Sequence, residues 1–150
     1  MHILFVCNAN IVRSFMAERV LRNRLKGRGA LIASVSSAGL LEMNSAPADP
    51  TARRILRENG IDDGNHRSRL LTDAILSDSD LIVTMELGQL KTIEQRFPES
   101  RKTLRVLKSY LPDYDPQSGD IADPYRCSVF HYRLCLAEIT LCVEAMIQCI

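Results

Sequence analysis

The feature that most constrains this chain is a short apolar segment near its N-terminus that leads through a polar loop into a helix-forming run. Residues 3–6 are uncharged and rich in β-formers, which indicates a buried strand ending at Cys7. In an open parallel sheet, such a strand-to-helix junction lies at the carboxyl edge, where ligands bind. The junction therefore predicts a phosphate-binding loop that consists of Asn8, Ala9, Asn10, Ile11, Val12, Arg13 and Ser14.

Three residues at this junction have the chemistry needed to attack a bound phosphate. The helix N-terminus presents free N–H groups and a partial positive charge to an oxyanion. Arg13 adds a planar guanidinium that matches two phosphate oxygens. Because these groups favour the thiolate, we expect Cys7 to be a nucleophile assisted by the hydroxyl of Ser14. The alternative is an inert cysteine at a strand end beside an unrelated surface arginine.

The composition is that of one ordinary globular domain over residues 1–150. Hydrophobic residues make up 46% of the chain, and the formal net charge of +1 gives no overall field for nucleic acid or a membrane. No apolar run approaches the roughly 20 residues of a membrane-spanning helix. Five cysteines without zinc-type spacing favour a reducing cytoplasm and predict no metal or other cofactor.

Strand and helix patterns alternate along the chain. Strands are predicted over residues 3–7, 32–37, 80–84 and 104–107. Helices are predicted over residues 14–26, 50–58, 72–76, 87–97 and 128–149, with a long loop over residues 108–125. This order predicts an α/β three-layer sandwich: a four-stranded parallel sheet has helices on both faces and the Cys7 loop at its carboxyl edge.

The long loop supplies a candidate for the second half of the chemistry. A thiolate that displaces an alkoxide or phenoxide from phosphorus needs an acid on the opposite side. Asp123, held rigid by Pro124 and followed by the aromatic Tyr125, is our candidate for that acid. Once ionised, Asp123 would accept a proton from the water that hydrolyses a cysteinyl-phosphate. Other carboxylates of the same loop are Asp113, Asp115 and Asp120.

Six motifs occur in the order and approximate spacing of the low-molecular-weight protein tyrosine phosphatase family, which the chain resembles over nearly its whole length. They are Cys7–Ser14, Ser37–Gly39, Pro47–Pro50, His66–Arg69, Asp80–Met85 and Asp123–Tyr125. The resemblance implies a phosphotyrosine phosphatase I-like fold and metal-independent hydrolysis of phosphotyrosine through a cysteinyl-phosphate. It assigns the nucleophile to Cys7, the phosphate clamp to Arg13 and the general acid and base to Asp123.

The resemblance also implies supporting roles and a substrate. Ser14, Ser37 and His66 match residues that support the loop in this family, in which the histidine hydrogen-bonds the asparagine that corresponds to Asn10. The alternative for Ser37 is a turn residue at a strand end, and the alternative for His66 is an exposed surface histidine. Positions that wall the substrate cleft match Leu40, Leu41, Tyr125 and Arg126. Some relatives prefer phosphoarginine and carry a small hydroxyl residue in place of Ile11, so this branched apolar side chain favours phosphotyrosine.

Several residues depart from the family pattern. Ala9 replaces a common glycine, which would cost about 1 kcal/mol or somewhat more if its φ were positive. Val12 removes a second cysteine of many relatives, and Phe15 replaces a proline. Arg126 stands where many relatives have a second tyrosine. Among the other thiols, we expect Cys127 to be a free surface residue and the following three to be small core residues: Cys135, Cys142 and Cys149.

Two other functions remain open at this point. A thiol-dependent arsenate reductase uses the same loop but needs resolving cysteines in a mobile segment, and residues 70–95 contain none. A catalytically silent phosphate-binding module would have a loop whose geometry Asn8 and Ala9 have spoiled. For the phosphatase we expect a tyrosine-phosphorylated protein or peptide as partner, such as a bacterial tyrosine kinase. We expect no nucleic acid or membrane as partner, and a monomer or weak homodimer.

Overall fold

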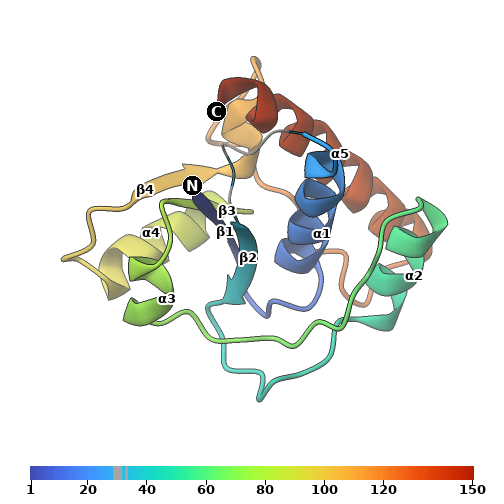
Figure 1. The fold of residues 1–150 in the computed structure, drawn as a ribbon, viewed down its shortest axis with the longest axis horizontal. Coiled ribbons are helices and arrows are strands. Elements are labelled where there is room, and N and C mark those ends of the chain that lie inside the picture. The colour runs from blue at the N-terminus through green and yellow to red at the C-terminus, as the bar shows by residue number, and fades with distance from the viewer. Residues whose placement is uncertain (29–31, 33) are drawn as a thin grey trace.

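The computed structural model describes residues 1–28, 32 and 34–150, and it contains a parallel sheet of four strands in the order β2-β1-β3-β4 (Figure 1). The strands are β1 (His2–Cys7), β2 (Ser34–Gly39), β3 (Leu81–Thr84) and β4 (Thr103–Val106). Every residue of β3 is buried, as expected for a central strand of a sheet covered on both faces.

Helices cover both faces of this sheet. Figure 1 shows α1, α2 and α5 on one side of the sheet and α3 and α4 on the other. Alternate side chains of β1 explain the two layers, because Ile3 and Phe5 join one apolar core whereas Leu4 and Val6 join the other. The predicted three-layer α/β sandwich is therefore confirmed. The helices are α1 (Arg13–Leu25), α2 (Pro50–Glu58), α3 (Asp73–Ser77), α4 (Leu87–Arg96), α5 (Val129–Cys149) and the 3-10 helix η1 (Leu107–Tyr110).

Differences between predicted and observed elements are small and have local causes. The strand predicted over residues 32–37 is β2, which continues to Gly39 because it pairs with β1 as far as Cys7; residue 33 lies outside the described residues. The predicted long loop begins inside η1. The helix predicted over residues 50–58 is α2, and the carboxylate of Asp49 caps it by accepting the N–H of Ala52 at 3.0 Å.

The carboxyl ends of the strands bring distant segments together. The chain after β1 forms the predicted phosphate loop, and the chain after β3 starts α4 beside it. The segment that carries Asp123 joins the same edge, because the N–H of Ile121 donates to the carbonyl of Met85 at 2.9 Å. Among the described residues, no helix has both the length and the apolar character needed to cross a membrane.

The packing of α2 generates a stability prediction. Ile55 is fully buried in the core, whereas Leu141 on α5 is 58% exposed. Ile55→Ala should therefore lower the free energy of unfolding by about 2–5 kcal/mol, measured by urea denaturation. The matched change Leu141→Ala should alter it by less than about 0.5 kcal/mol. Equal losses in the two variants would contradict the assignment of the α2 face to the core.

Candidate active site

The sulfur of Cys7 lies at the end of β1, where the N-terminus of α1 faces it. It is 3.0 Å from the hydroxyl oxygen of Ser14 and 3.5 Å from the backbone nitrogen of the same residue. A thiolate accepts hydrogen bonds from both groups, because a sulfur anion is an acceptor only. Cys7 is 3% exposed, so its sulfur and these two donors lie in a site largely shielded from water.

Asn10 fixes the shape of the loop behind this sulfur. It is fully buried and has a φ of 58°, a left-handed conformation that asparagine tolerates better than most residues. Its side-chain amide donates to the hydroxyl of Ser14 at 2.8 Å, and its side-chain oxygen accepts the N–H of Arg69 at 3.1 Å. Ala9 does not share the positive φ, so its methyl group adds no backbone strain there.

His66 supports the loop from the other side. Its Nε2 is 2.6 Å from the carbonyl oxygen of Asn10, and because a carbonyl only accepts, Nε2 carries the proton. Burial lowers the pKa of His66, and the positive charges of Arg19 and Arg69 lower it further, so the neutral ring is favoured. The ring of Phe15 packs on it at a centroid distance of 4.7 Å.

The end of β2 holds the loop through its backbone. A Cβ atom at Gly39 would lie only 2.8 Å from the carbonyl oxygen of Asn8, so the close approach of the loop requires glycine. The N–H groups of Leu40 and Leu41 then donate to the carbonyls of Cys7 and Asn8 at 3.0 and 2.9 Å. The two leucines therefore hold the loop in place through backbone contacts.

Ser37 lies in β2 and contacts a buried carboxylate that the sequence analysis did not identify. Its hydroxyl donates to Glu18 at 2.5 Å, and Glu18 also pairs with Arg22 at 2.9 Å. Glu18 is only 8% exposed. Its place one helical turn after Ser14, on the buried face of α1, is a signal that could have revealed it.

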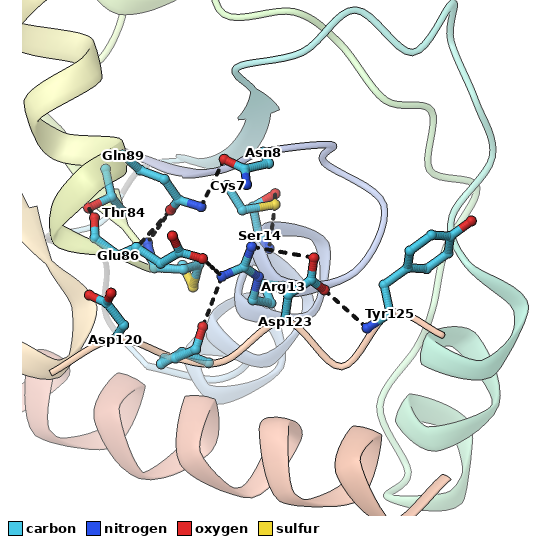
Figure 2. A network of polar contacts seen from close by, with 12 residues as sticks. Cys7, Asn8, Arg13, Ser14, Thr84, Glu86, Gln89, Asp120, Asp123 and Tyr125 are labelled. Carbon is cyan, nitrogen blue, oxygen red and sulfur yellow. Dashed lines mark hydrogen bonds and ion pairs between the residues drawn. The ribbon is translucent and has the colours of Figure 1, made fainter. Parts of the chain in front are cut away.

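Arg13 is held on one edge by acceptors and faces the site with the other. Its Nη1 donates to the carboxylate of Glu86 and to the carbonyl of Ile121, the latter at 2.8 Å, while Nη2 is 3.6 Å from Asp123 (Figure 2). Burial opposes the charge, but Cys7, Glu86 and Asp123 outweigh it and raise the pKa of Arg13. The guanidinium is therefore a permanent cation in fixed orientation.

Gln89 links Glu86, the partner of Arg13, to the phosphate loop. The sequence analysis did not identify Gln89 either. Its side-chain oxygen accepts the N–H groups of Met85 and Glu86 at 3.0 and 3.1 Å, and its amide donates to the side chain of Asn8 at 3.2 Å. Figure 2 shows this path from Asn8 to Glu86. The spacing of Glu86 and Gln89 directly after a strand is that of a capping box, which could have been recognised.

A narrow pocket of about 70 Å³ opens over the sulfur. Its lining consists of Cys7, Ala9, Ile11, Val12, Arg13, Met43, Asp123 and Tyr125. Of the residues expected to wall the cleft, Tyr125 lines this pocket. Leu40 is instead packed in the core, and Leu41 lies outside the pocket. Met43, which was not predicted, lines the pocket. Arg126 is also outside the lining, although its guanidinium carbon lies 5.4 Å from the Tyr125 ring centroid.

The carboxylate of Asp123 reaches the same pocket. One oxygen accepts the N–H of Tyr125 at 3.1 Å, and the other is 3.6 Å from Arg13. Its side chain is 47% exposed, in contrast to the buried Cys7. Asp120 has a different role, since its carboxylate accepts the N–H of Leu87 at 2.9 Å and so fastens the loop to α4.

The other thiols lie outside this pocket. Burial raises the pKa of Cys135 to about 12 and that of Cys142 to about 11, so both are protonated and unreactive at neutral pH. Cys127 is exposed as expected, but Cys149 is also exposed, so its expected place in the core was wrong; it is the last residue of α5. Within the described part of the chain, no group of three His, Cys, Asp or Glu residues could hold a metal ion.

Two variants of Asn10 should separate its backbone and side-chain contributions. Asn10→Gly keeps the positive φ but loses the bonds to Ser14 and Arg69, whereas Asn10→Ala loses the bonds and is strained as well. Asn10→Ala should therefore be less stable than Asn10→Gly by about 1–2 kcal/mol in urea denaturation. Equal stability of the two variants would show that the left-handed backbone is not needed.

Comparisons with known proteins agree with this geometry. Residues 2–150 match the family described as low molecular weight phosphotyrosine protein phosphatase. A probable low molecular weight protein-tyrosine-phosphatase, EpsP of Ralstonia nicotianae, is 37% identical over 145 residues, which are 97% of this chain and 92% of EpsP.

Two solved structures are similar as well. Wzb of Vibrio vulnificus in complex with benzylphosphonate has a TM-score of 0.86 and 32% identity, over 99% of this chain and 98% of that chain. The YwlE arginine phosphatase, in a cysteine-to-serine mutant with a phosphorylated active-site serine, has a TM-score of 0.87 and 28% identity, over 99% and 92%. The chain therefore belongs to the low molecular weight phosphotyrosine protein phosphatase family, whose members are hydrolases.

Proposed function

We propose that this chain hydrolyses phosphotyrosine in a metal-independent reaction through a cysteinyl-phosphate, with Cys7 as nucleophile, Arg13 as phosphate clamp and Asp123 as general acid and base. The observation that carries the proposal is that these three side chains line one narrow pocket. The phosphorylated serine in the YwlE mutant supports it, because that serine replaces a cysteine.

In the first step, the thiolate of Cys7 attacks phosphorus, and the bond between phosphorus and the tyrosyl oxygen breaks. Asp123 gives its proton to the leaving oxygen, so a neutral phenol departs. The N–H groups of the loop and the free edge of the Arg13 guanidinium bind the phosphoryl oxygens. Because Nη1 of Arg13 is already bound to Glu86 and Ile121, the guanidinium needs no reorientation.

In the second step, water attacks the phosphorus of the cysteinyl-phosphate and gives a proton to the carboxylate of Asp123. The bond between phosphorus and sulfur breaks, and the thiolate and inorganic phosphate are released. The hydroxyl of Ser14, 3.0 Å from the sulfur, stabilises the departing thiolate. Asp123 is protonated again and ready for the next cycle.

The lining of the pocket supports an aromatic substrate. Ala9, Ile11, Val12 and Met43 contribute apolar surface, and Tyr125 contributes an aromatic ring at the pocket. Benzylphosphonate, bound in the similar Wzb structure, likewise joins an aryl ring to a phosphoryl group. We therefore propose a tyrosine-phosphorylated cytoplasmic protein as substrate, and a phosphorylated bacterial tyrosine kinase is one such protein.

The geometry gives less support to the two alternative functions. An arsenate reductase needs a second thiol that reaches Cys7, and the described thiols besides Cys7 are absent from the pocket lining. A silent phosphate-binding module requires a distorted loop, whereas Ala9 is unstrained and Asn8 is hydrogen-bonded to Gln89. Arsenate reduction coupled to a thiol donor would separate the first alternative from the phosphatase.

Hydrolysis of an aryl phosphate in excess chelator tests the mechanism. Wild-type protein should turn over, and Cys7→Ser should abolish turnover because the nucleophile is lost. Asp123→Ala should lower kcat by about 10²- to 10⁴-fold with little change in phosphate binding, since only proton transfer is removed. The matched control Asp113→Ala, in the same loop but outside the pocket, should keep the wild-type kcat. Full activity of Asp123→Ala would refute its role as the acid.

Exchange of Ile11 tests the preference for tyrosine over arginine. Ile11 contributes apolar surface to the pocket, and Thr replaces part of that surface with a hydroxyl group. Ile11→Thr should shift the ratio of kcat/KM for phosphotyrosine to that for phosphoarginine by about tenfold toward phosphoarginine. Ile11→Val, which keeps an apolar side chain, should leave the ratio near the wild-type value. An unchanged ratio in the threonine variant would remove Ile11 from the determinants of specificity.

A further inference from the structure

A second, larger pocket is lined in part by His66 and Arg69, the two residues that hydrogen-bond Asn10 of the phosphate loop. It has a volume of about 360 Å³ and is formed by α1, β2 and the segment of residues 65–69. None of the residues that line it lines the active-site pocket. This basin contains four arginines, which are Arg19, Arg22, Arg67 and Arg69.

The charge of the basin is positive although the whole chain is almost neutral. Arg22 pairs with Glu18 at 2.9 Å, and Arg19 pairs with Asp62 at 3.3 Å. Arg67 and Arg69 hydrogen-bond only to backbone carbonyl oxygens through their side chains among the contacts of the described residues. Four guanidinium groups thus meet two carboxylates, a local excess of two positive charges in a chain with a net charge of +1.

Three of these guanidinium groups are held in place by their own neighbours. The Nε atoms of Arg19 and Arg69 donate to the carbonyls of Asp62 and Ser37 at 2.7 and 2.9 Å, and Nη2 of Arg22 donates to Val35 at 2.6 Å. Arg19 also lies against the backbone of Gly64, where a Cβ atom would come within 2.8 Å of its Nη1. Each anchored group keeps further N–H donors, so little conformational entropy is lost when an anion binds.

We propose that this basin binds a small polyphosphate anion, a chain of two or more phosphoryl groups such as inorganic pyrophosphate or the phosphates of a nucleotide. Guanidinium groups arranged around one hollow match an anion with several charged oxygens better than a single phosphate, which one or two forks already satisfy. Arg19 and Arg22 are one helical turn apart and so address neighbouring phosphoryl groups. Neutral ligands would leave the surplus charge uncompensated.

The basin shares two residues with the support of the phosphate loop. His66 and Arg69 line it, and both hydrogen-bond Asn10, the first to its backbone carbonyl and the second to its side chain. An anion in the basin would therefore contact residues that hold the catalytic loop from behind. Binding itself is independent of the proposed phosphatase reaction, so it is tested without turnover.

Site-resolved NMR titration of the Cys7→Ser protein with pyrophosphate tests the proposal. Benzylphosphonate is first added to fill the active site, which is read from the amides of residues 8–14. Pyrophosphate should then shift the Nε–H signals of Arg19 and Arg69 and the amides of residues 65–69 in a saturable manner. Shifts confined to residues 8–14, or shifts without saturation, would overturn the proposal, and failure of benzylphosphonate to shift residues 8–14 would instead count against the proposed function.

A pair of charge-matched variants identifies the site. The double variant Arg19→Gln, Arg67→Gln removes two of the four guanidinium groups and should weaken pyrophosphate binding by about tenfold or more. The control Arg54→Gln, Arg101→Gln removes two exposed charges outside the basin and should change the affinity less than about twofold, by screened long-range attraction only. Equal weakening in both would show that net charge alone attracts the anion. The single, exposed Arg67→Gln change gives the same test if the first variant unfolds.

Discussion

The rest of the site depends on the contacts that the buried guanidinium of Arg13 makes with its acceptors. The guanidinium is almost fully buried, and a buried cation is tolerated only when acceptors surround it. Its acceptors are Glu86 at the start of α4, the carbonyl of Ile121 and the carboxylate of Asp123. One side chain at the start of α1 therefore joins the segment after β3 to the segment that carries Asp123. Removing Glu86 would leave the buried guanidinium charge partly unpaired and loosen its fixed orientation.

Much of the fold can be predicted from local patterns in the sequence. The apolar run of β1, the cap of Asp49 before Pro50 and the cap of Thr72 all act within a few residues, so they can be recognised without a structure. The end of β2 is different, because its last residue is set by pairing with Cys7 on another strand. No short-range signal encodes that register, which is why the predicted strand stopped too early.

The same distinction separates the predictable and the missed parts of the site. Cys7, Arg13 and Ser14 lie within one strand-to-helix junction, so their spacing in the sequence predicts that they are close in space. Glu18, Glu86 and Gln89 bind partners up to 81 residues away along the chain, and a buried polar side chain reveals such a partner only when the chain is folded. The cleft wall shows the limit of positional analogy, since Met43 lines the pocket although Leu40 and Leu41 precede it closely.

The active-site pocket and the proposed anion-binding basin both present guanidinium groups to an anion, but they differ in the other groups that surround it. In the active-site pocket, the sulfur of Cys7 lies together with the guanidinium of Arg13 and the carboxyl group of Asp123, so in the proposed reaction a bound phosphoryl group is attacked and its leaving group protonated. The basin contains several guanidinium groups, but no cysteine lines it. Positive charge alone binds an anion without transforming it. Because Asn10 receives hydrogen bonds from His66 and Arg69 on one side and donates to Ser14 on the other, the two environments meet at a single buried residue.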